Sequence, residues 1–281
     1  MVQCYSGMNP VELSIFANRI EAVCDEMGAA LQRAAFSPNI RDRLDYSCAV
    51  FDADGELCAQ AAHIPVHLGS MAFAMRGIVE GIDWKDGDMV ILNDPYMGGT
   101  HLPDVTVIAP VFIDKQVLGF VANRAHHADI GAEQPGSMPL STSLQQEGLV
   151  IRPQKLDEHG AIDEANMNRL MQPMRNPAES TGDFSAQIAA NRRGSYRLIE
   201  LIQQMGTQRY SEALEALNHY AEQLAISCLN AIPDGEYHFS DVLDDDGLGH
   251  TDIEIWAGIV VQRGRIDVDF KGTSSQVRGN V

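Results

Sequence analysis

Basic residues are scarce in this chain, and that scarcity excludes whole classes of partner. The 281 residues include 20 lysines and arginines against 39 acids, which gives a formal net charge of -19. A protein that grips a nucleic-acid backbone needs clusters of lysine and arginine, and the sequence has no such cluster. The acidic balance also disfavours anionic membrane surfaces. We therefore expect neither nucleic acid nor a membrane among the partners.

Cysteine and long apolar runs are also lacking. The five cysteines are widely spaced and form no CxxC pair. This pattern disfavours a disulfide framework and a zinc–thiolate site, and it is typical of a reducing compartment. The sequence shows no N-terminal signal pattern and no apolar run long enough to span a bilayer. These observations together predict a cytoplasmic protein.

Three common catalytic signatures are missing as well. The sequence contains no GxxxxGK[ST] loop, no GxGxxG turn after a strand and no GxSxG elbow. These motifs hold nucleotide phosphates, dinucleotides and a serine nucleophile, respectively. If the reaction needs ATP, a different chain must bind it.

What is present is an alternation of helical and strand patterns. Apolar residues recur at helical spacing in some segments and as short β-branched runs between turn residues in others. The fold class we predict is α+β, with antiparallel hairpins packed against helices. The helices are expected at 9–35, 69–79 and 211–229 and, broken at Pro173 and Pro177, across 167–205; the strands are expected at 46–51, 57–61, 89–92, 105–112, 117–123, 237–243, 253–261 and 266–270.

Three regions follow from this pattern. Residues 1–160 form an α+β region that holds the chemistry, residues 161–232 are helical, and residues 233–281 begin a β-rich region. Residues 133–160 read as loop. The sequence stops just after a strong strand and a glycine- and serine-containing segment, so we expect a chain cut within a domain.

The densest chemical signal lies between residues 93 and 131. Residues 93–104 read NDPYMGGTHLPD, and residues 124–131 read RAHHADIG. Strands 105–112 and 117–123 lie between them, and a hairpin brings its open ends together. His101, Asp104 and His126 are then candidates for a divalent-metal site, because imidazoles and carboxylates suit zinc, manganese or iron. Ordinary polar loop residues are the alternative.

Adjacent side chains on a strand point to opposite faces, so His126 and His127 cannot both face one metal. One is expected to be a ligand, and the other a residue that supports the ligands or contacts substrate. Asp129 could orient an imidazole by accepting a hydrogen bond from the ring nitrogen that does not bind the metal.

Other polar clusters have two readings each. His63 and His67 would share a face only in a helix, and Pro65 argues against one, so a structured loop is the alternative to a functional cluster. Asp42 is expected to pair with its neighbouring arginines, whereas Asp45 leads into an apolar strand and could turn inward. The acidic run 244–246 reads as a solvated hairpin turn, since the ligand spacing of a calcium loop is absent.

Several long stretches resemble the hydantoinase B family in order along the chain. They are RDRLDYSCAVFDADGELCAQAAHIPVHLGSM, ILNDPYMGGTHLPDVTVIAPVF, NRAHHADIGA, QEGLVI, DFSAQIAANRRG and IDVDFKGTSSQVRGNV. That family includes the B component of N-methylhydantoinase, the C-terminal half of 5-oxoprolinase, and subunits of caprolactamase and of acetone and acetophenone carboxylases. Its members are longer than this chain, so the resemblance implies an N-terminal portion. Ala132 departs from the family, which usually has a second glycine there.

The resemblance implies a set of roles for individual residues. The family's metal motif falls on His101, Asp104 and His126, with Asp45 as a fourth ligand. His127 and Asp129 become candidates for catalytic proton transfer. The remaining implied positions line the substrate pocket, namely Asn93, Asp94, Gly98 and Gly99.

The resemblance also implies a partner and a reaction. A hydantoinase A-type ATPase subunit would phosphorylate the substrate, and this chain would act on the activated intermediate in a hetero-oligomer. The implied activity is that of a metal-dependent subunit of an ATP-dependent cyclic-amide hydrolase, a C–N hydrolase acting on a hydantoin, 5-oxoproline or a lactam. A subunit of an ATP-dependent ketone carboxylase and a non-catalytic scaffold subunit are the alternatives.

Overall fold

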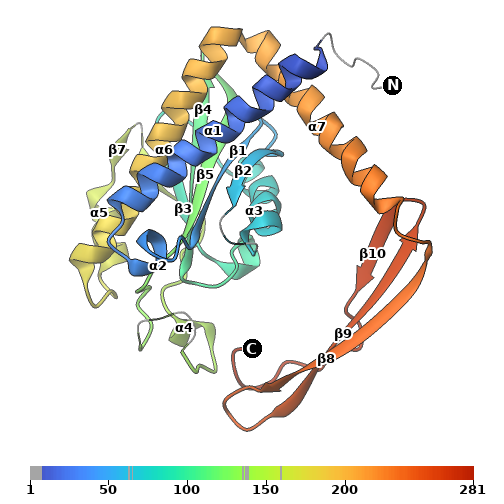
Figure 1. Cartoon of the computed structure of the whole chain (residues 1–281). Coiled ribbons are helices and arrows are strands. Elements are labelled where there is room, and N and C mark those ends of the chain that lie inside the picture. The colour runs from blue at the N-terminus through green and yellow to red at the C-terminus, as the bar shows by residue number, and fades with distance from the viewer. Residues whose placement is uncertain (1–7, 63, 65, 135, 137–138, 159) are drawn as a thin grey trace.

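The structure, a computed structural model, describes residues 8–281 apart from residues 63, 65, 135, 137–138 and 159. The described part forms a seven-stranded sheet, in the order β2-β1-β5-β4-β3-β6-β7, and a three-stranded sheet, in the order β10-β9-β8 (Figure 1). Each strand pair is antiparallel. The expected α+β class is confirmed.

The large sheet and the helices packed around it comprise the elements up to residue 205. Its strands are β1 (Tyr46–Phe51), β2 (Leu57–Ala62), β3 (Met89–Leu92), β4 (Asp104–Ile113), β5 (Gln116–His126), β6 (Gln154–Glu158) and β7 (Ala161–Ile162). Its helical elements are α1 (Pro10–Ala34), α2 (Pro38–Arg41), α3 (His67–Gly81), η1 (Pro95–Met97), α4 (Leu144–Glu147), α5 (Glu164–Met171) and α6 (Pro177–Met205).

The large sheet is covered on both faces. Alternate residues of a strand point to opposite sides. Cys48 and Val50 of β1 therefore join the core beneath α1 and α6, whereas Ala49 and Phe51 join a second core beneath α3. Because both faces are buried, each residue of β1 is buried, and the strand is mostly apolar rather than alternately polar, with Ser47 as its buried polar residue.

The hairpin of β4 and β5 is the longest pairing in the large sheet and carries the site. Asp114 and Lys115 turn the chain with φ values of 49° and 67°, the left-handed conformation that tight hairpin turns require. The register then pairs Asp104 with His126 at the open end. The expected hairpin is confirmed, and both strands run further toward that end than the apolar pattern indicates.

A buried amide network fastens this hairpin to α6. The side chain of Gln187 donates to the Val105 carbonyl at 2.8 Å and to Asn123 Oδ1 at 2.9 Å. Asn123 donates to Asn191 Oδ1 at 2.8 Å, and Asn191 donates to the Val107 carbonyl at 2.9 Å. These amides are inaccessible to solvent, so the network fixes the helix against the strands in one register.

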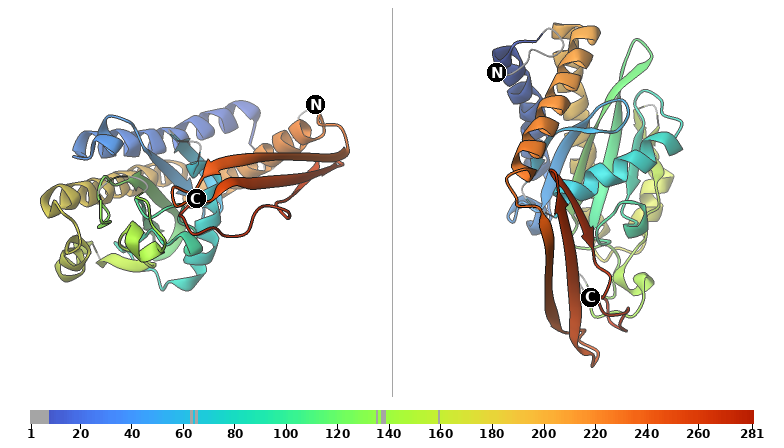
Figure 2. Two further views of the ribbon diagram at one scale, coloured as in Figure 1. Left: turned by 90° about the horizontal axis from the view of Figure 1, so that it is seen from below. Right: turned by 90° about the vertical axis from the view of Figure 1, so that its right-hand side faces the viewer.

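Beyond α6 the chain leaves the large sheet. Helix α7 (Thr207–Leu229) leads to β8 (Gly235–Asp245), β9 (Thr251–Gln262) and β10 (Arg265–Asp269), which lie apart from the large sheet (Figures 1 and 2). Most side chains of these strands are exposed. The acidic turn differs from expectation at Asp246, which is buried because its carboxylate accepts from the backbone N–H groups of Leu248, His250 and Gly279.

Two further segments differ from the sequence-based expectation. Helix α6 begins at Pro177 instead of breaking there, because proline is tolerated in the first turn, where no N–H is needed. Segment 133–160 contains α4 and strand β6, which pairs with β3. Among the described residues, no helix is long and apolar enough to cross a membrane.

We predict that Gln187→Leu destabilises the protein by about 2–4 kcal/mol, because it leaves buried donors and acceptors of the amide network unpaired. Urea unfolding measures the change. The matched control is Gln203→Leu, the same substitution at an exposed position of α6. Equal stability of the two variants would contradict a structural role for the network.

Candidate metal centre

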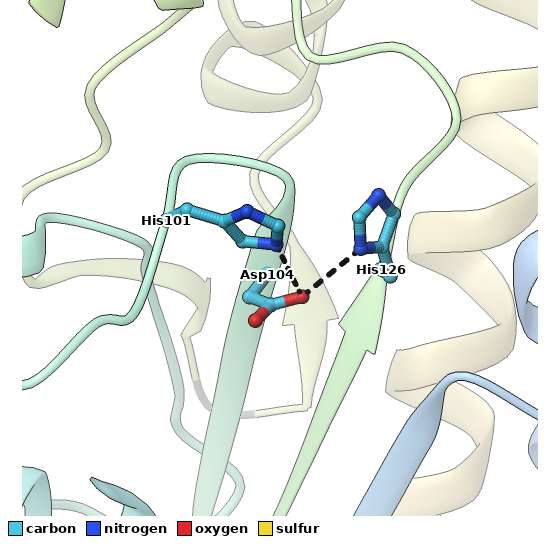
Figure 3. A group of neighbouring side chains, drawn as sticks. All are labelled: His101, Asp104 and His126. Atoms are coloured by element: carbon cyan, nitrogen blue, oxygen red, sulfur yellow. Dashed lines mark ion pairs between the residues drawn. The ribbon is translucent and has the colours of Figure 1, made fainter. Parts of the chain in front are cut away.

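The open end of the β4–β5 hairpin gathers two imidazoles around one carboxylate (Figure 3). Asp104 begins β4 and His126 ends β5, and the two are paired residues in the register. Asp104 Oδ1 lies 3.4 Å from His126 Nδ1 and 3.2 Å from His101 Nε2. His101 reaches this point because a tight turn joins its carbonyl to the Asp104 N–H at 3.0 Å. The sequence grouped the same three residues.

Asp45 reaches the cluster from the neighbouring strand. It directly precedes β1, which pairs with β5, and its carbonyl accepts from the His126 N–H at 3.0 Å. Its carboxylate oxygen Oδ2 lies 3.4 Å from His126 Nδ1. The inward turn considered for Asp45 is therefore what the structure shows, whereas Asp42 pairs with Arg41 at the surface.

The charge of Asp104 dominates the electrostatics of the cluster. Burial by itself would raise the pKa of Asp104, but the neighbouring imidazoles of His101, His126 and His67 outweigh it and hold that pKa well below its usual range. Burial likewise disfavours the charged form of His101, yet the Asp104 carboxylate raises the pKa of His101 above its ordinary value. The cluster therefore keeps its carboxylate ionised in a largely buried place.

One atom of the cluster tests whether a cation fits. Asp104 Oδ1 is buried and has no hydrogen-bond partner, although the ring nitrogens of His101 and His126 lie close to it. One nitrogen of each ring and this oxygen lie within 4.8 Å of one another, so potential ligand atoms converge on one point. A nitrogen and oxygen set of this kind matches zinc, manganese or iron, and the three residues fit such an ion.

The sequence grouped His67 only with His63 and left a structured loop as the alternative, whereas the structure places His67 at the candidate centre. It begins α3 and is fully buried, so Pro65 does not prevent a helix from starting two residues later. Its Nε2 lies 3.3 Å from Asp104 Oδ2. With Asp45 and Asp104 it forms a second group whose donor atoms are close enough for a metal. His63 lies outside the described residues.

His127 lies on the other side of the hairpin from His126. Its ring packs on Phe184 of α6, and its Nε2 lies 2.9 Å from Gln187 Oε1. Because the Gln187 NH₂ group already donates twice, its oxygen must accept, so the hydrogen of His127 sits on Nε2. Nδ1 is then a buried lone pair without a partner. Burial lowers the pKa of His127 below its usual value.

Asp129 is placed where it holds the backbone. Its Oδ1 accepts from the Gly131 N–H at 2.8 Å, and its Oδ2 accepts from the Arg175 N–H at 2.6 Å. Both oxygens therefore tie the loop after β5 to the chain that precedes α6. Asp129 belongs to neither of the two groups of candidate metal ligands.

Of the four residues expected to line the substrate pocket, one lines a groove, and the other three hold the conformation of the loop. Asn93 is fully buried, donates to the Leu102 and Leu149 carbonyls, and accepts from the Ile151 N–H. A side chain on Gly98 or Gly99 would collide with nearby main chain. Asp94 differs from these three, because it lines an open groove.

That groove has a volume of about 690 Å³ and does not include His101, Asp104 or His126 among its walls. Its lining includes Asp94 and Tyr96 of the β3–β4 loop, Leu144 of α4 and Arg169 of α5. The groove and the metal cluster thus share the β3–β4 loop.

A fully buried arginine links the loop to the cluster. Arg124 of β5 donates to Thr106 Oγ1 at 2.8 Å, to Ser70 Oγ at 2.6 Å and to the Gly98 carbonyl at 2.7 Å. Burial lowers the pKa of Arg124 to about 10, against the attraction of Asp104. No feature of the sequence distinguished this arginine from surface ones, since arginine is rarely buried.

We predict that Asp104→Asn lowers the pKa of His101 in the chelator-treated protein. The carboxylate is what raises that pKa, and burial without it favours the neutral ring. His101 should then lose its proton at a lower pH than in the parent, as followed by NMR of labelled histidine. The control is Asp42→Asn, which removes an exposed carboxylate paired with Arg41. An unchanged His101 titration in Asp104→Asn would contradict the assignment.

Comparison with known proteins identifies the family of this chain. A family model described as Hydantoinase B/oxoprolinase matches residues 9–281. The chain is 38% identical over 299 residues to 5-oxoprolinase 1 of Arabidopsis thaliana, covering 96% of this chain and 23% of that protein. It is 33% identical over 282 residues to the putative B-type subunit of a D-/L-hydantoinase of Pseudomonas sp., covering 96% of this chain and 48% of that protein.

Two solved structures are also similar to this chain. The ATP-dependent caprolactamase of Pseudomonas jessenii superposes with a TM-score of 0.89 at 29% identity, over 97% of this chain and 48% of that chain. A nucleotide-free acetone carboxylase superposes with a TM-score of 0.85 at 21% identity, over 96% of this chain and 38% of that chain, and shows the fold alone. The chain thus spans about half or less of these proteins, and it belongs to the hydantoinase B/oxoprolinase family.

Proposed function

We propose that this chain is the metal-dependent component of an ATP-dependent cyclic-amide hydrolase. The observation that carries the proposal is the convergence of His101 Nε2 and His126 Nδ1, at 3.2 Å and 3.4 Å, on the buried Asp104 Oδ1, which has no hydrogen-bond partner. Relatives named as a 5-oxoprolinase and as a hydantoinase subunit, and a similar structure named as an ATP-dependent caprolactamase, support hydrolysis of cyclic amides.

The ligands we propose are Asp45, His101, Asp104 and His126. A zinc, manganese or iron ion held there would supply Lewis-acid chemistry, which polarises a carbonyl and makes water more acidic. The chain itself contributes the ionised Asp104 carboxylate and keeps it from solvent. The side chains of His101 and Asp45 are 33% and 26% exposed, and they mark the side from which substrate can approach.

The remaining expected residues take supporting roles in this proposal. His127 and Asp129, which were expected to transfer protons, take structural roles in this proposal, since the His127 ring lies on the α6 side of the hairpin and both oxygens of Asp129 accept from backbone. Asp94 contributes a carboxylate to the groove wall. Asn93, Gly98 and Gly99 hold the loop that carries Asp94.

A partner subunit is supported by the name of one relative. The sequence has none of the phosphate-binding loops that would hold ATP, and the Pseudomonas relative is named as one subunit of its enzyme, which indicates an assembly. We infer that a hydantoinase A-type ATPase subunit activates the cyclic amide and that this chain completes its hydrolysis. Ketone carboxylation is supported by likeness of fold alone.

We predict near-stoichiometric zinc, manganese or iron in the purified chain and its loss from a His101→Ala, Asp104→Ala double variant. Elemental analysis after incubation with each metal and desalting measures this. The matched control is His219→Ala with Glu222→Ala, a histidine–acid pair at the same i,i+3 spacing on α7, with a half-buried histidine and an exposed acid. Absence of metal from the parent would overturn the metal-dependent proposal.

We also predict that the double variant loses cyclic-amide hydrolysis by at least about 100-fold when combined with the ATPase subunit, because the proposed ligands are removed. Product formation from 5-oxoproline, hydantoin and a lactam is measured with ATP present. The His219→Ala, Glu222→Ala control should retain activity. A fully active double variant would favour a non-catalytic scaffold, and carbon–carbon bond formation from a ketone and bicarbonate would favour the carboxylase.

A further inference from the structure

A buried series of three hydrogen-bonded side chains, Ser47, His67 and Asp104, leads away from the candidate metal centre. Ser47 of β1 lies behind His67, with its Oγ 3.0 Å from His67 Nδ1. On the other side of the ring, His67 Nε2 lies 3.3 Å from Asp104 Oδ2. Ser47 and His67 are fully buried, and Asp104 is 2% exposed, so no bulk solvent can replace a partner that is removed.

The chemistry of each group decides which atoms of Ser47, His67 and Asp104 donate and which accept. An ionised carboxylate only accepts, so the hydrogen that faces Asp104 must be carried by His67 Nε2. In a neutral imidazole the other nitrogen is then an acceptor. The Ser47 hydroxyl therefore donates to Nδ1, and the three groups form one relay from Ser47 through His67 to Asp104.

The two oxygens of Asp104 consequently have different surroundings. Oδ2 accepts from His67 and from the hydroxyl of Thr100. Oδ1 accepts from nothing and faces His101 and His126 at 3.2 Å and 3.4 Å. One edge of the carboxylate is saturated by donors, and the other edge is left for a cation.

We propose that His67 is a positioning residue that holds the Asp104 carboxylate in the rotation that presents Oδ1 to the metal. The inference rests on the metal site of the proposed function and adds to it a residue outside the ligand set. Hydrogen-bonded partners of this kind orient metal ligands, and their loss weakens binding. His67 could instead ligate with Asp45 and Asp104, but the oxygen it faces is already occupied by Thr100.

The test compares two substitutions of His67 by their affinity for metal alone. His67→Gln keeps an N–H donor near the position of Nε2, whereas His67→Phe keeps a ring and removes the donor. Competition with a chromophoric chelator measures the dissociation constant for zinc in each protein. We expect His67→Phe to bind zinc about 10–100-fold more weakly than the parent, and His67→Gln to recover most of the parent's affinity.

Two controls separate positioning from loss of structure. His238→Phe makes the same exchange at an exposed histidine that stacks on Trp256 of the small sheet, and it should leave zinc affinity unchanged. Circular dichroism of the metal-free proteins reports folding, and the rise in melting temperature on adding zinc reports the site. If His67→Phe fails to fold, Ser47→Ala removes the far donor of the relay and should weaken zinc binding to a smaller extent.

The outcomes distinguish failure of this inference from failure of the proposed function. Zinc binding by the parent with equal affinity in His67→Phe would overturn the positioning role and leave the metal site intact. Two zinc ions in the parent, one of them lost in both His67 variants, would make His67 a ligand and overturn the proposal. A parent that binds no metal would overturn the proposed function and this inference together.

Discussion

The register of one antiparallel strand pair determines the geometry of the candidate metal centre. In β4 and β5, Asp104 lies opposite His126, and β1 then places Asp45 beside His126 from the other edge. A slip of one residue would turn each side chain of a strand to the other face of the sheet and would scatter the cluster. Both faces are buried beneath helices, so such a slip would also bury the wrong residues. The core that stabilises the fold therefore also holds the ligand geometry.

The same alternation divides the polar residues of the hairpin into two groups. Asp104, Thr106, Arg124 and His126 occupy alternate positions, and they interact with one another, with α3 and with the β3–β4 loop. The intervening positions, including Asn123 and His127, bond to the amides of α6. His126 and His127 are neighbours in sequence, yet they belong to two separate networks. Charge gathers on the first side, where Asp104 faces three imidazoles, and neutral amides fill the second.

The sequence predicted this fold well where a pattern is local. Alternating and continuous apolar runs located the β4–β5 hairpin, and the hairpin alone sufficed to group His101, Asp104 and His126. The sequence singled out His67 but did not place it beside Asp104, because its partners, Ser47 and Asp104, are 20 and 37 residues away and no spacing rule connects them. Strand β6 was missed because its pairing with β3, rather than its own polar composition, makes it a strand. Non-local contacts of this kind are set by the assembled sheet.

The exposed fractions of the side chains show which side of the candidate centre faces solvent. His67 and Asp104 lie at the closed back, whereas His101 and Asp45 lie at a partly open front. The β3–β4 loop carries His101 near one end and Asp94, in the wall of the 690 Å³ groove, near the other. Arg124 ties the Gly98 carbonyl within that loop to the strand that ends in His126. A substrate that displaced the loop would therefore disturb the ligands, and tight binding at the ligands would hold the loop in place. The loop beside the groove and the strand that ends in His126 are thus coupled through one buried guanidinium, whose three acceptors leave it little freedom to rearrange.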